Sequence, residues 1–459
     1  DKALKAIEDT RFVPSSGKKR LRGMIETRPD WCVSRQRAWG VPITVFVNKK
    51  TGEPLRDQAV LDRITDAFEA EGADAWFASE ASRFLGPEHD AADYEQVTDI
   101  LDVWFDSGCT HAFTLEARDD LQWPASLYLE GTDQHRGWFH SSLLESCGTR
   151  GRAPYDAVLT HGFVMGEDGQ KMSKSLGNIV SPKDVVDQHG ADVLRLWVVG
   201  SDYSEDLRIG PEILKSHSDI YRRLRNTLRF LLGNLNGFDD TEKVDVADMP
   251  EMERWVLHRL WQMDKLLRQA CDDLNFHSMF AELHNFCTVD LSAFYFDVRK
   301  DSLYCDRADD IKRRASRTVL DEIFNCLTAW LAPFICFTAE EAWLSRHPDD
   351  SPSNSVHLRA FPDIPETWRD DELAARWEKI RGLRRVVTGA IELERREKRI
   401  GSSLQAHPVV YAPPENIVLF DGLDAAELFI TSSADFSTEA PGDGGFSLIE
   451  TPDITVRSN

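Results

Sequence analysis

Short apolar runs alternate with longer helical stretches from residue 28 to about residue 210. The strand-like runs are 127–130 and 157–160, and the helical stretches are 138–147 and 184–199. Strands that alternate with helices in this way are typical of a parallel sheet covered by helices. We therefore predict an α/β domain over residues 1–210. Residues 48–93 are polar and mixed, and we expect them to form an insertion in this domain.

The apolar positions change to a helical period after residue 210. One stripe consists of Met252, Val256, Leu260, Met263 and Leu267, and a second of Phe276, Phe280, Leu283, Cys287, Leu291 and Phe294. Spacings of three and four place each stripe on one helix face. They predict an all-α bundle over residues 211–365, in which each stripe is a core face or, alternatively, a binding groove. The acidic stretch 238–250 either separates two parts of the bundle or forms a loop within it.

Residues 366–459 predict a C-terminal helix followed by a small mixed α/β segment. The charged helical stretch runs to Arg399, and strand-like pieces follow at 408–411 and 428–431. Residues 421–459 carry eight acidic residues and one basic residue, which disfavours RNA binding by this tail.

Charge and cysteine content narrow the function classes. The net charge of -24 over 459 residues disfavours non-specific binding to DNA or to membranes, so any RNA contact needs a local basic patch. The longest apolar run, 326–337, is interrupted by Pro333 and is shorter than the roughly 20 residues that span a bilayer. The eight cysteines include no Cys-x-x-Cys pair, so we predict reduced core thiols and no metal site. The first residue is Asp1, and we expect the chain to be part of a longer protein.

A lysine-containing loop is the first candidate for chemistry. Lys171 and Lys174 are three residues apart in the stretch Lys-Met-Ser-Lys-Ser, which is flanked by glycines at 166, 169 and 177. Two ammonium groups on such a loop can oppose the negative charge that develops on a leaving pyrophosphate. The alternative is a solvated basic turn.

Polar residues also gather where the predicted strand 127–130 ends. Glu130 and Asp133 can accept hydrogen bonds from an amine or a ribose, Gln134 can donate and accept, and Gly131 lets the backbone approach a ligand. Ligands of open α/β sheets bind at this end of the strands. Helix capping is the alternative role for Asp133 and Gln134.

Two tryptophans and one histidine have two interpretations each. Trp104 and Trp138 either belong to the core or form the walls of a pocket for a branched aliphatic side chain. His161 either lies near a nucleotide or closes the end of a strand.

Basic side chains concentrate on one helical segment of the otherwise acidic chain. They are Arg222, Arg223, Arg225 and Arg229. A second basic run occupies 395–399. Either run fits contacts with an RNA stem, and either is also compatible with a solvated helix face.

The loop Lys171-Met172-Ser173-Lys174-Ser175 resembles the signature loop of class I aminoacyl-tRNA synthetases, as does the preceding His161-Gly-Phe. Segments 28–43, 102–108 and 130–139 are similar to the isoleucyl branch of that family, particularly its bacterial members. Similarity continues through 294–299 and 332–343, so the resemblance covers nearly the whole chain.

The resemblance implies a function for each part of the chain. Residues 1–210 would be the second half of a Rossmann-like catalytic domain, and residues 211–365 an anticodon-binding bundle. The expected reaction joins isoleucine to tRNA(Ile) with ATP and Mg²⁺, in a cytoplasmic and monomeric protein. By resemblance, isoleucyl-adenylate is held by Glu130, Gly131, Asp133, Gln134, Trp104 and Trp138. ATP is contacted by Lys174, Lys171, Ser173 and His161, and tRNA by Arg222, Arg223, Arg225 and Arg229.

Several family features do not occur in this sequence. The family's His-x-Gly-His, which holds ATP from the opposite side, is absent, as is the editing domain. Zinc is expected only in a tail beyond this chain. We therefore expect a C-terminal fragment that neither edits nor activates isoleucine by itself. The alternatives are a tRNA-binding module with a non-functional nucleotide site, or a synthetase for another branched amino acid such as valine.

Overall fold

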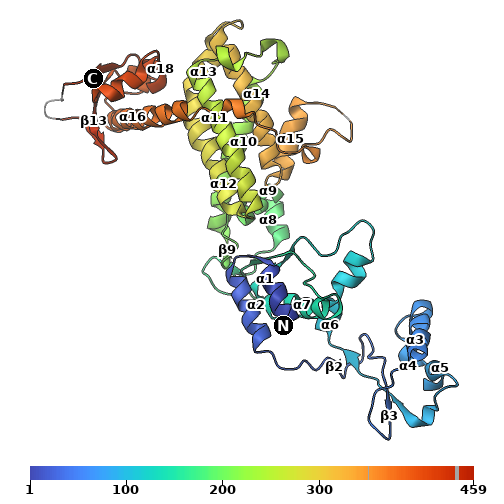
Figure 1. Ribbon diagram of the computed structural model, residues 1–459. Coiled ribbons are helices and arrows are strands. Elements are labelled where there is room, and N and C mark those ends of the chain that lie inside the picture. Colours follow the sequence, from blue (N-terminus) through green and yellow to red (C-terminus); the bar gives the residue numbers. More distant parts are fainter. Residues whose placement is uncertain (350, 440–443, 459) are drawn as a thin grey trace. The chain divides into compact units, whose positions relative to one another are not determined.

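The computed structural model describes residues 1–349, 351–439 and 444–458, and its elements are labelled in Figure 1. The chain forms two compact units, one of residues 1–164 and 203–207, the other of 165–202 and 208–459. Residues 165–202 join the second unit because α9 (Ala191–Val199) packs against α10 (Pro211–Asn234). The units thus divide at residues other than 210, and the domain limits inferred from the sequence stay a prediction.

The first unit contains a parallel sheet, as predicted. Its order is β1 (Arg11–Val13), β7 (Ala157–His161), β6 (Tyr128–Gly131), and both pairings are parallel. The sheet packs with α1 (Lys2–Asp9), α2 (Ser16–Glu26) and α7 (Trp138–Thr149) around a core that includes Ile7, Leu21 and Phe139. β1 completes the sheet and was not among the predicted strands.

The predicted insertion is a lobe with a core of its own. β3 (Phe46–Asn48) pairs antiparallel with β4 (Tyr94–Gln96), and α3 (Gln58–Glu71), α4 (Ala75–Ala78) and α5 (Ala81–Leu85) lie between them in the chain. Trp76 is fully buried in this lobe and donates its indole N–H to the Val97 carbonyl at 2.7 Å. Because its core is small, most side chains of the lobe stay in water and its sequence is polar.

The first unit continues through short elements that lead to the candidate site. β2 (Ser34–Arg35) pairs antiparallel with β5 (Ile100–Leu101). α6 (Val103–Gly108) and the π-helix η2 (His111–Glu116) follow, and the 3₁₀-helix η3 (Thr132–His135) lies between β6 and α7.

The second unit begins with the strand that leads into the lysine loop. β8 (Val164–Gly166) and β9 (Leu207–Ile209) form a two-stranded sheet, through which the division between the units passes. The helix predicted at 184–199 is two helices, α8 (Pro182–His189) and α9, because Gly190 adopts a φ of 90° between them.

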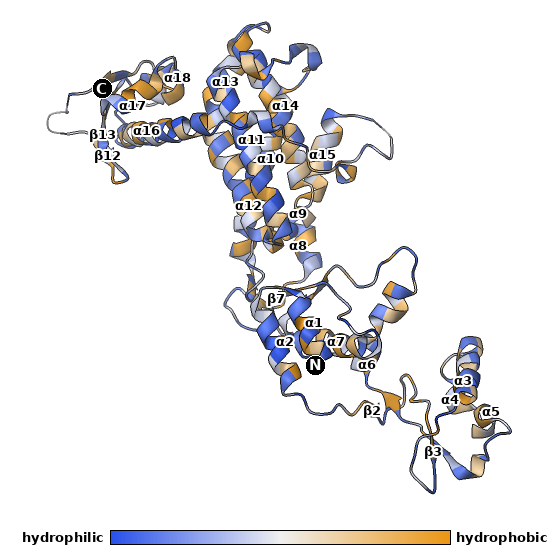
Figure 2. Ribbon diagram, in the orientation of Figure 1, coloured by the Kyte–Doolittle hydropathy of each residue, from blue (hydrophilic) through white to orange (hydrophobic). Residues whose placement is uncertain are grey.

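The bundle is built from helices that alternate hydrophobic and hydrophilic residues (Figure 2). They are α10, α11 (Glu251–Asp272), α12 (Phe276–Asn285), the π-helix η6 (Phe286–Tyr295), α13 (Phe296–Cys305), α14 (Ile311–Leu331) and α15 (Cys336–Arg346). Both predicted stripes face one continuous core, with Phe276 at its margin. The stretch 238–250 is a loop within the bundle, because Arg317 of α14 pairs with Glu242 at 2.6 Å and the hydroxyl of Thr318 accepts from the Val244 N–H.

The C-terminal part consists of a long helix and a mixed segment, as predicted. α16 (Asp371–Arg396) packs against a sheet of order β11 (Asp435–Ser437), β10 (Pro408–Tyr411), β13 (Thr451–Ser458), β12 (Phe446–Leu448). The strand predicted at 428–431 is wrong. Leu428 and Phe429 end the short helix α18 (Ala425–Phe429), which Asp424 caps, and Ile430 turns the chain with a φ of 58°.

All eight cysteines are free. Cys32 and Cys305 are exposed, so the expectation that all eight are core thiols is wrong for these two. Across residues 1–349, 351–439 and 444–458, no helix is both long and apolar enough to cross a membrane. Nor does the same part of the chain contain a group of His, Cys, Asp or Glu side chains that could hold a metal ion.

Candidate active site

Three of the predicted site residues meet at the carboxyl ends of two neighbouring parallel strands. Gly131 of β6 is the register partner of His161 of β7, and the exposed Glu130 is the partner of Thr160. A Cβ atom on Gly131 would lie 2.6 Å from Oδ1 of Asp133, so a larger residue here would displace this carboxylate. His161 places Nδ1 2.8 Å from the Gly162 carbonyl, which assigns that nitrogen as the donor. A strand end with carboxylates, an imidazole and accessible backbone therefore forms here.

Gln134 has a capping role, which was one of its two predicted roles. Its Oε1 accepts from the backbone N–H of Trp138 at 3.0 Å, at the start of α7, and its Nε2 donates to Asp133 at 3.1 Å. Asp133 itself is exposed and caps no helix. Gln134 therefore fixes the carboxylate of Asp133 while that carboxylate still faces solvent.

The two tryptophans differ in environment. Trp138 stacks on Tyr128 with ring centroids 4.1 Å apart and donates its indole N–H to the Ser107 carbonyl at 2.9 Å. Trp104 is 43% exposed, and its ring would lie 3.0 Å from a Cβ atom on Gly137. Trp138 thus has the contacts of a core residue, whereas Trp104 offers an open aromatic surface beside Gln134.

Asp102 organises this region and was not singled out in the sequence. Its buried carboxylate caps α6 by accepting from the Trp104 N–H at 3.0 Å, accepts from the indole of Trp31 at 3.3 Å, and pairs with Arg35. The only signal in the sequence is a helix-capping aspartate two residues before Trp104. Asp102 sets the orientation of the helix that carries Trp104.

A protonatable pair lies between α6 and α7. The Cys109 thiol donates to Glu145 at 3.1 Å, and a Cβ atom on Gly108 would lie 2.5 Å from the Glu145 carboxylate. Burial raises the pKa of Glu145 to about 7, and burial beside this carboxyl raises the pKa of Cys109 to about 12. Cys109 therefore stays a thiol at neutral pH.

The lysine loop belongs to the second unit and is closed by its own hydrogen bonds. The hairpin turn before it joins the Gly166 N–H to the Gln170 carbonyl at 2.8 Å, and Oδ1 of Asn178 accepts from the Ser173 N–H at 2.9 Å. The hydroxyl of Ser173 accepts from the Leu176 N–H at 3.3 Å. Lys171 and Lys174 are exposed, and neither forms an ion pair with any described residue. The loop therefore presents two uncompensated ammonium groups.

The four predicted tRNA-binding arginines are exposed on α10, but two of them have acidic partners. Arg222 pairs with Asp219 at 2.6 Å, and Arg225 pairs with Glu341 of α15 at 2.8 Å. Arg223 and Arg229 have no ion pair within the described part of the chain. The free positive charge of this helix is thus smaller than its composition suggests.

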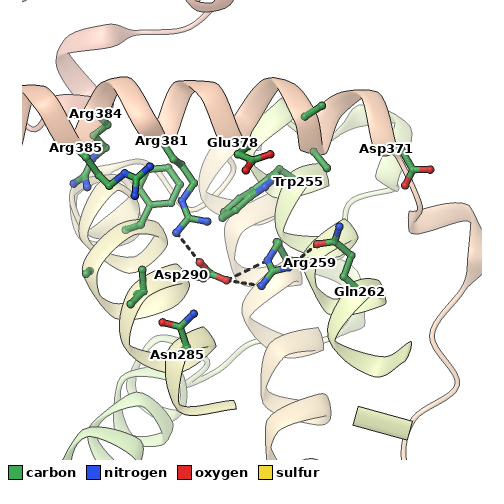
Figure 3. A pocket seen from close by; sticks show the side chains of 15 residues that line it. Trp255, Arg259, Gln262, Asn285, Asp290, Asp371, Glu378, Arg381, Arg384 and Arg385 are labelled. Carbon is green, nitrogen blue, oxygen red and sulfur yellow. Dashed lines mark hydrogen bonds and ion pairs between the residues drawn. The ribbon is translucent and has the colours of Figure 1, made fainter. Parts of the chain in front are cut away.

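A groove rich in arginine that the sequence did not reveal lies between α11, η6 and α16 (Figure 3). It encloses about 770 Å³, and at its base Asp290 accepts from Arg259 at 2.9 Å and from Arg381 at 2.6 Å. Arg384 donates to the Leu428 carbonyl at 2.7 Å, and the exposed Arg385 lies on the next position of α16. Neither forms an ion pair with a described residue, but Asp371 and Glu378 also line the groove, so its four arginines exceed its three carboxylates by one charge. Its residues are far apart in the sequence, which hid it.

Comparison with known families assigns both parts of the chain. Residues 1–210 match the family model of class I tRNA synthetases for I, L, M and V, and residues 253–410 match that of the anticodon-binding domain of tRNA ligase. Isoleucine–tRNA ligases of Mesorhizobium japonicum and Brucella abortus are 57% and 58% identical to it over 99% of its length. The chain belongs to the class I tRNA synthetases. This synthetase chain spans 45% and 46% of those two relatives' lengths, slightly less than half.

Solved structures agree on the fold of the synthetase. Methionyl-tRNA synthetase of Mycobacterium tuberculosis, bound by methionyl-adenylate, superposes with a TM-score of 0.54 at 17% identity over 78% of this chain and 63% of its own. LeuRS of Agrobacterium radiobacter, in a ternary complex with tRNA and LeuAMS, gives 0.53 at 18% identity over 74% of this chain and 43% of its own. The predicted order of an α/β catalytic part followed by a helical anticodon-binding part is confirmed.

Proposed function

We propose that this chain forms part of an isoleucine–tRNA ligase that activates isoleucine with ATP and transfers it to tRNA(Ile). The observation that carries the proposal is the pair of unneutralised ammonium groups on the signature loop, Lys171 and Lys174. The identity to isoleucine–tRNA ligases supports isoleucine as the amino acid.

The strand end of the first unit would hold the adenylate. Glu130 and Asp133 carry carboxylates that can accept hydrogen bonds from the substrate amine and the ribose hydroxyls. Gln134 would hold the Asp133 carboxylate in place, and Gly131 would let the ligand approach the backbone. The imidazole of His161 would lie next to the nucleotide. Trp104 would contact the isoleucine side chain. Trp138 would hold the start of α7 in place through its contacts with Tyr128 and Ser107.

In the first step, a carboxylate oxygen of isoleucine attacks the α-phosphorus of ATP, and the bond to pyrophosphate breaks. Lys171 and Lys174 would offset the charge that develops on the departing pyrophosphate, and Ser173 would maintain the loop conformation. Mg²⁺ bound to ATP would supply further positive charge to the phosphates. In the second step, a terminal ribose hydroxyl of the tRNA attacks the isoleucyl carbonyl, and AMP leaves. The protein contributes positioning and electrostatics to both steps.

Two surfaces of the second unit would contact tRNA. Arg222, Arg223, Arg225 and Arg229 of α10 form one, and the groove with Arg384 and Arg385 forms the other. Because the groove lies within the residues that match an anticodon-binding domain, it is the better candidate for the anticodon.

The amino acid specificity is tested by pyrophosphate exchange in a protein completed to the length of its relatives. We expect kcat/KM for isoleucine to exceed that for valine by roughly tenfold or more, because one methylene in an apolar pocket is worth about 1–3 kcal/mol. Equal values would favour a different branched substrate. Tight tRNA binding without any exchange would favour the alternative of an RNA-binding module with a non-functional nucleotide site.

A further inference from the structure

A small surface cavity in the first unit is lined by arginines and by no carboxylate. It encloses about 360 Å³ between α2 and the start of α7, and Arg20, Arg28, Arg136 and His140 contribute its polar side chains together with Thr27. Elsewhere on α2, Arg22 pairs with Glu8 at 2.7 Å and with Glu26 at 2.8 Å. In contrast, none of the three cavity arginines forms an ion pair with a described residue. Because the whole protein has a net charge of -24, this group of arginines is a local excess of positive charge.

The contacts and the pKa of His140 reflect the uncompensated positive charge of the neighbouring arginines. Nη1 of Arg28 lies 3.2 Å from Nε2 of His140, and because a guanidinium can only donate, the imidazole accepts and is neutral. Burial, together with the charges of Arg28 and Arg136, lowers the pKa of His140 to about 4. Burial also lowers the pKa of Arg28. Arg28 is therefore a partly desolvated cation whose nearest polar partner carries no charge.

Arg28 lies over the ring of Trp31, 5.2 Å from its centroid, and donates to the Pro29 carbonyl at 3.4 Å, but no group of opposite charge offsets the remaining cost. Guanidinium groups in one cavity repel each other, and the loss of water around Arg28 weakens their solvation. A phosphate oxygen pair matches the fork of a guanidinium and would remove both costs. The cavity contains no aromatic ring other than His140 and no amide side chain that could recognise a base.

We propose that the cavity lined by Arg20, Arg28 and Arg136 binds a phosphate group of an RNA backbone. RNA as the source of the phosphate rests on the proposed function, whereas the anion site itself does not. Arg28 is held in place by His140, and the exposed Arg20 and Arg136 close on the phosphate from solvent. The contact positions RNA on the first unit without reading its sequence.

The ring nitrogens of His140 provide a local readout. In the ¹⁵N-histidine-labelled chain at pH 7, the resonance missing in His140→Gln identifies His140. Adding a single-stranded RNA oligonucleotide should move this resonance to a saturating end point, because a phosphate beside Arg28 changes the hydrogen bond that Nε2 accepts. Arg136→Gln should raise the half-saturating RNA concentration by roughly fivefold and lower its dependence on salt, whereas Arg56→Gln, an exposed arginine outside the cavity, should change neither.

Two outcomes overturn the proposal. If RNA leaves the His140 resonance unmoved, or if Arg136→Gln and Arg56→Gln behave alike, the cavity is not an RNA phosphate site. If inorganic phosphate moves the resonance and RNA does not, the site takes a free phosphate and the assignment to an RNA backbone is wrong. The readout needs no ATP exchange, so it stays interpretable even if the proposed ligase activity fails.

Discussion

The carboxylate of Glu167 accepts a hydrogen bond from the backbone N–H of Ile213 at 3.1 Å. Glu167 lies in the hairpin turn four residues before Lys171, and Ile213 lies in the first turn of α10. Gly210 permits the approach, since a Cβ atom there would lie 2.5 Å from Glu167. The lysine loop is therefore fastened to the N-terminus of the helix that carries the predicted tRNA-binding arginines.

Removal of this hydrogen bond should loosen the loop. A side chain that caps a helix N-terminus is worth about 0.5–2 kcal/mol, so Glu167→Ala should speed amide hydrogen exchange of residues 168–178 by roughly fivefold. The control is Glu212→Ala, which removes an exposed carboxylate from the same helix turn. Equal exchange in the two variants would contradict the fastening role of Glu167.

Gly137→Ala should disturb the proposed isoleucine pocket. A Cβ atom at this position would lie 2.5 Å from Oε1 of Gln134 and 3.0 Å from the ring of Trp104, so both side chains must shift. In the completed protein we expect the KM for isoleucine to rise roughly tenfold and the KM for ATP to change little. Gly148→Ala, on the same helix with no atom within 4 Å of the new Cβ, is the matched control. If Gly137→Ala keeps a normal KM for isoleucine, the proposed contact between Trp104 and the isoleucine side chain is wrong.

Glu145→Gln should stabilise the first unit in a pH-dependent way. The pKa of Glu145 is raised from 4.5 to about 7 in the fold, so the fold binds this proton more tightly than the unfolded chain does. The resulting stability is complete below pH 4.5 and is lost as pH rises through 7. Glutamine removes the penalty and keeps an acceptor for Cys109, so unfolding at pH 8 should cost on the order of 2 kcal/mol more than in the parent chain. At pH 4 the difference should nearly vanish.

Calorimetric melting at the two pH values measures this difference. Glu116→Gln is the control, because Arg150 lowers the pKa of Glu116 and this replacement should not stabilise the unit at pH 8. A gain in Glu145→Gln that is the same at both pH values would mean that packing, and not the proton, is responsible.

Arg385→Gln should weaken tRNA binding by roughly three- to tenfold and reduce the salt dependence of the affinity by about one ion. The reason is that Arg385 is an exposed cation of the groove without an acidic partner in the described residues. Arg307→Gln removes an exposed arginine that is already paired with Asp309 and serves as the control. Fluorescence anisotropy of labelled tRNA measures both variants. A larger loss in Arg229→Gln than in Arg385→Gln would place the main contact on α10.

Sequence patterns correctly predicted the helices and strands that are determined by their own residues. The stripe from Met252 to Leu267 is buried as its period predicts, and the strand that ends at His161 lies beside the strand of Glu130. The strand predicted at 428–431 failed because Asp424 caps a short helix there, a contact that outweighs the β-branched residues that follow. A stretch of four residues is too short for its periodicity to distinguish a strand from a short helix.

Contacts between distant residues were not accessible from the sequence. The capping carboxylate of Asp102 gathers Trp31 and Arg35 from about 70 positions away. The groove around Asp290 likewise draws arginines from α11 and α16. The number of arginines on α10 also overstates its positive charge, because Glu341 pairs with Arg225.

The proposed role of the lysine loop is to act on the phosphates of ATP. Its most direct test is isoleucine-dependent pyrophosphate exchange in the completed protein, comparing Lys174→Ala with Lys183→Ala, a nearby exposed lysine already paired with Asp187 at 2.5 Å. We predict that Lys174→Ala lowers kcat by roughly 100-fold or more, because preorganised charge at a leaving group is worth several kcal/mol, and that Lys183→Ala leaves kcat unchanged. Full exchange activity in Lys174→Ala would contradict the claim.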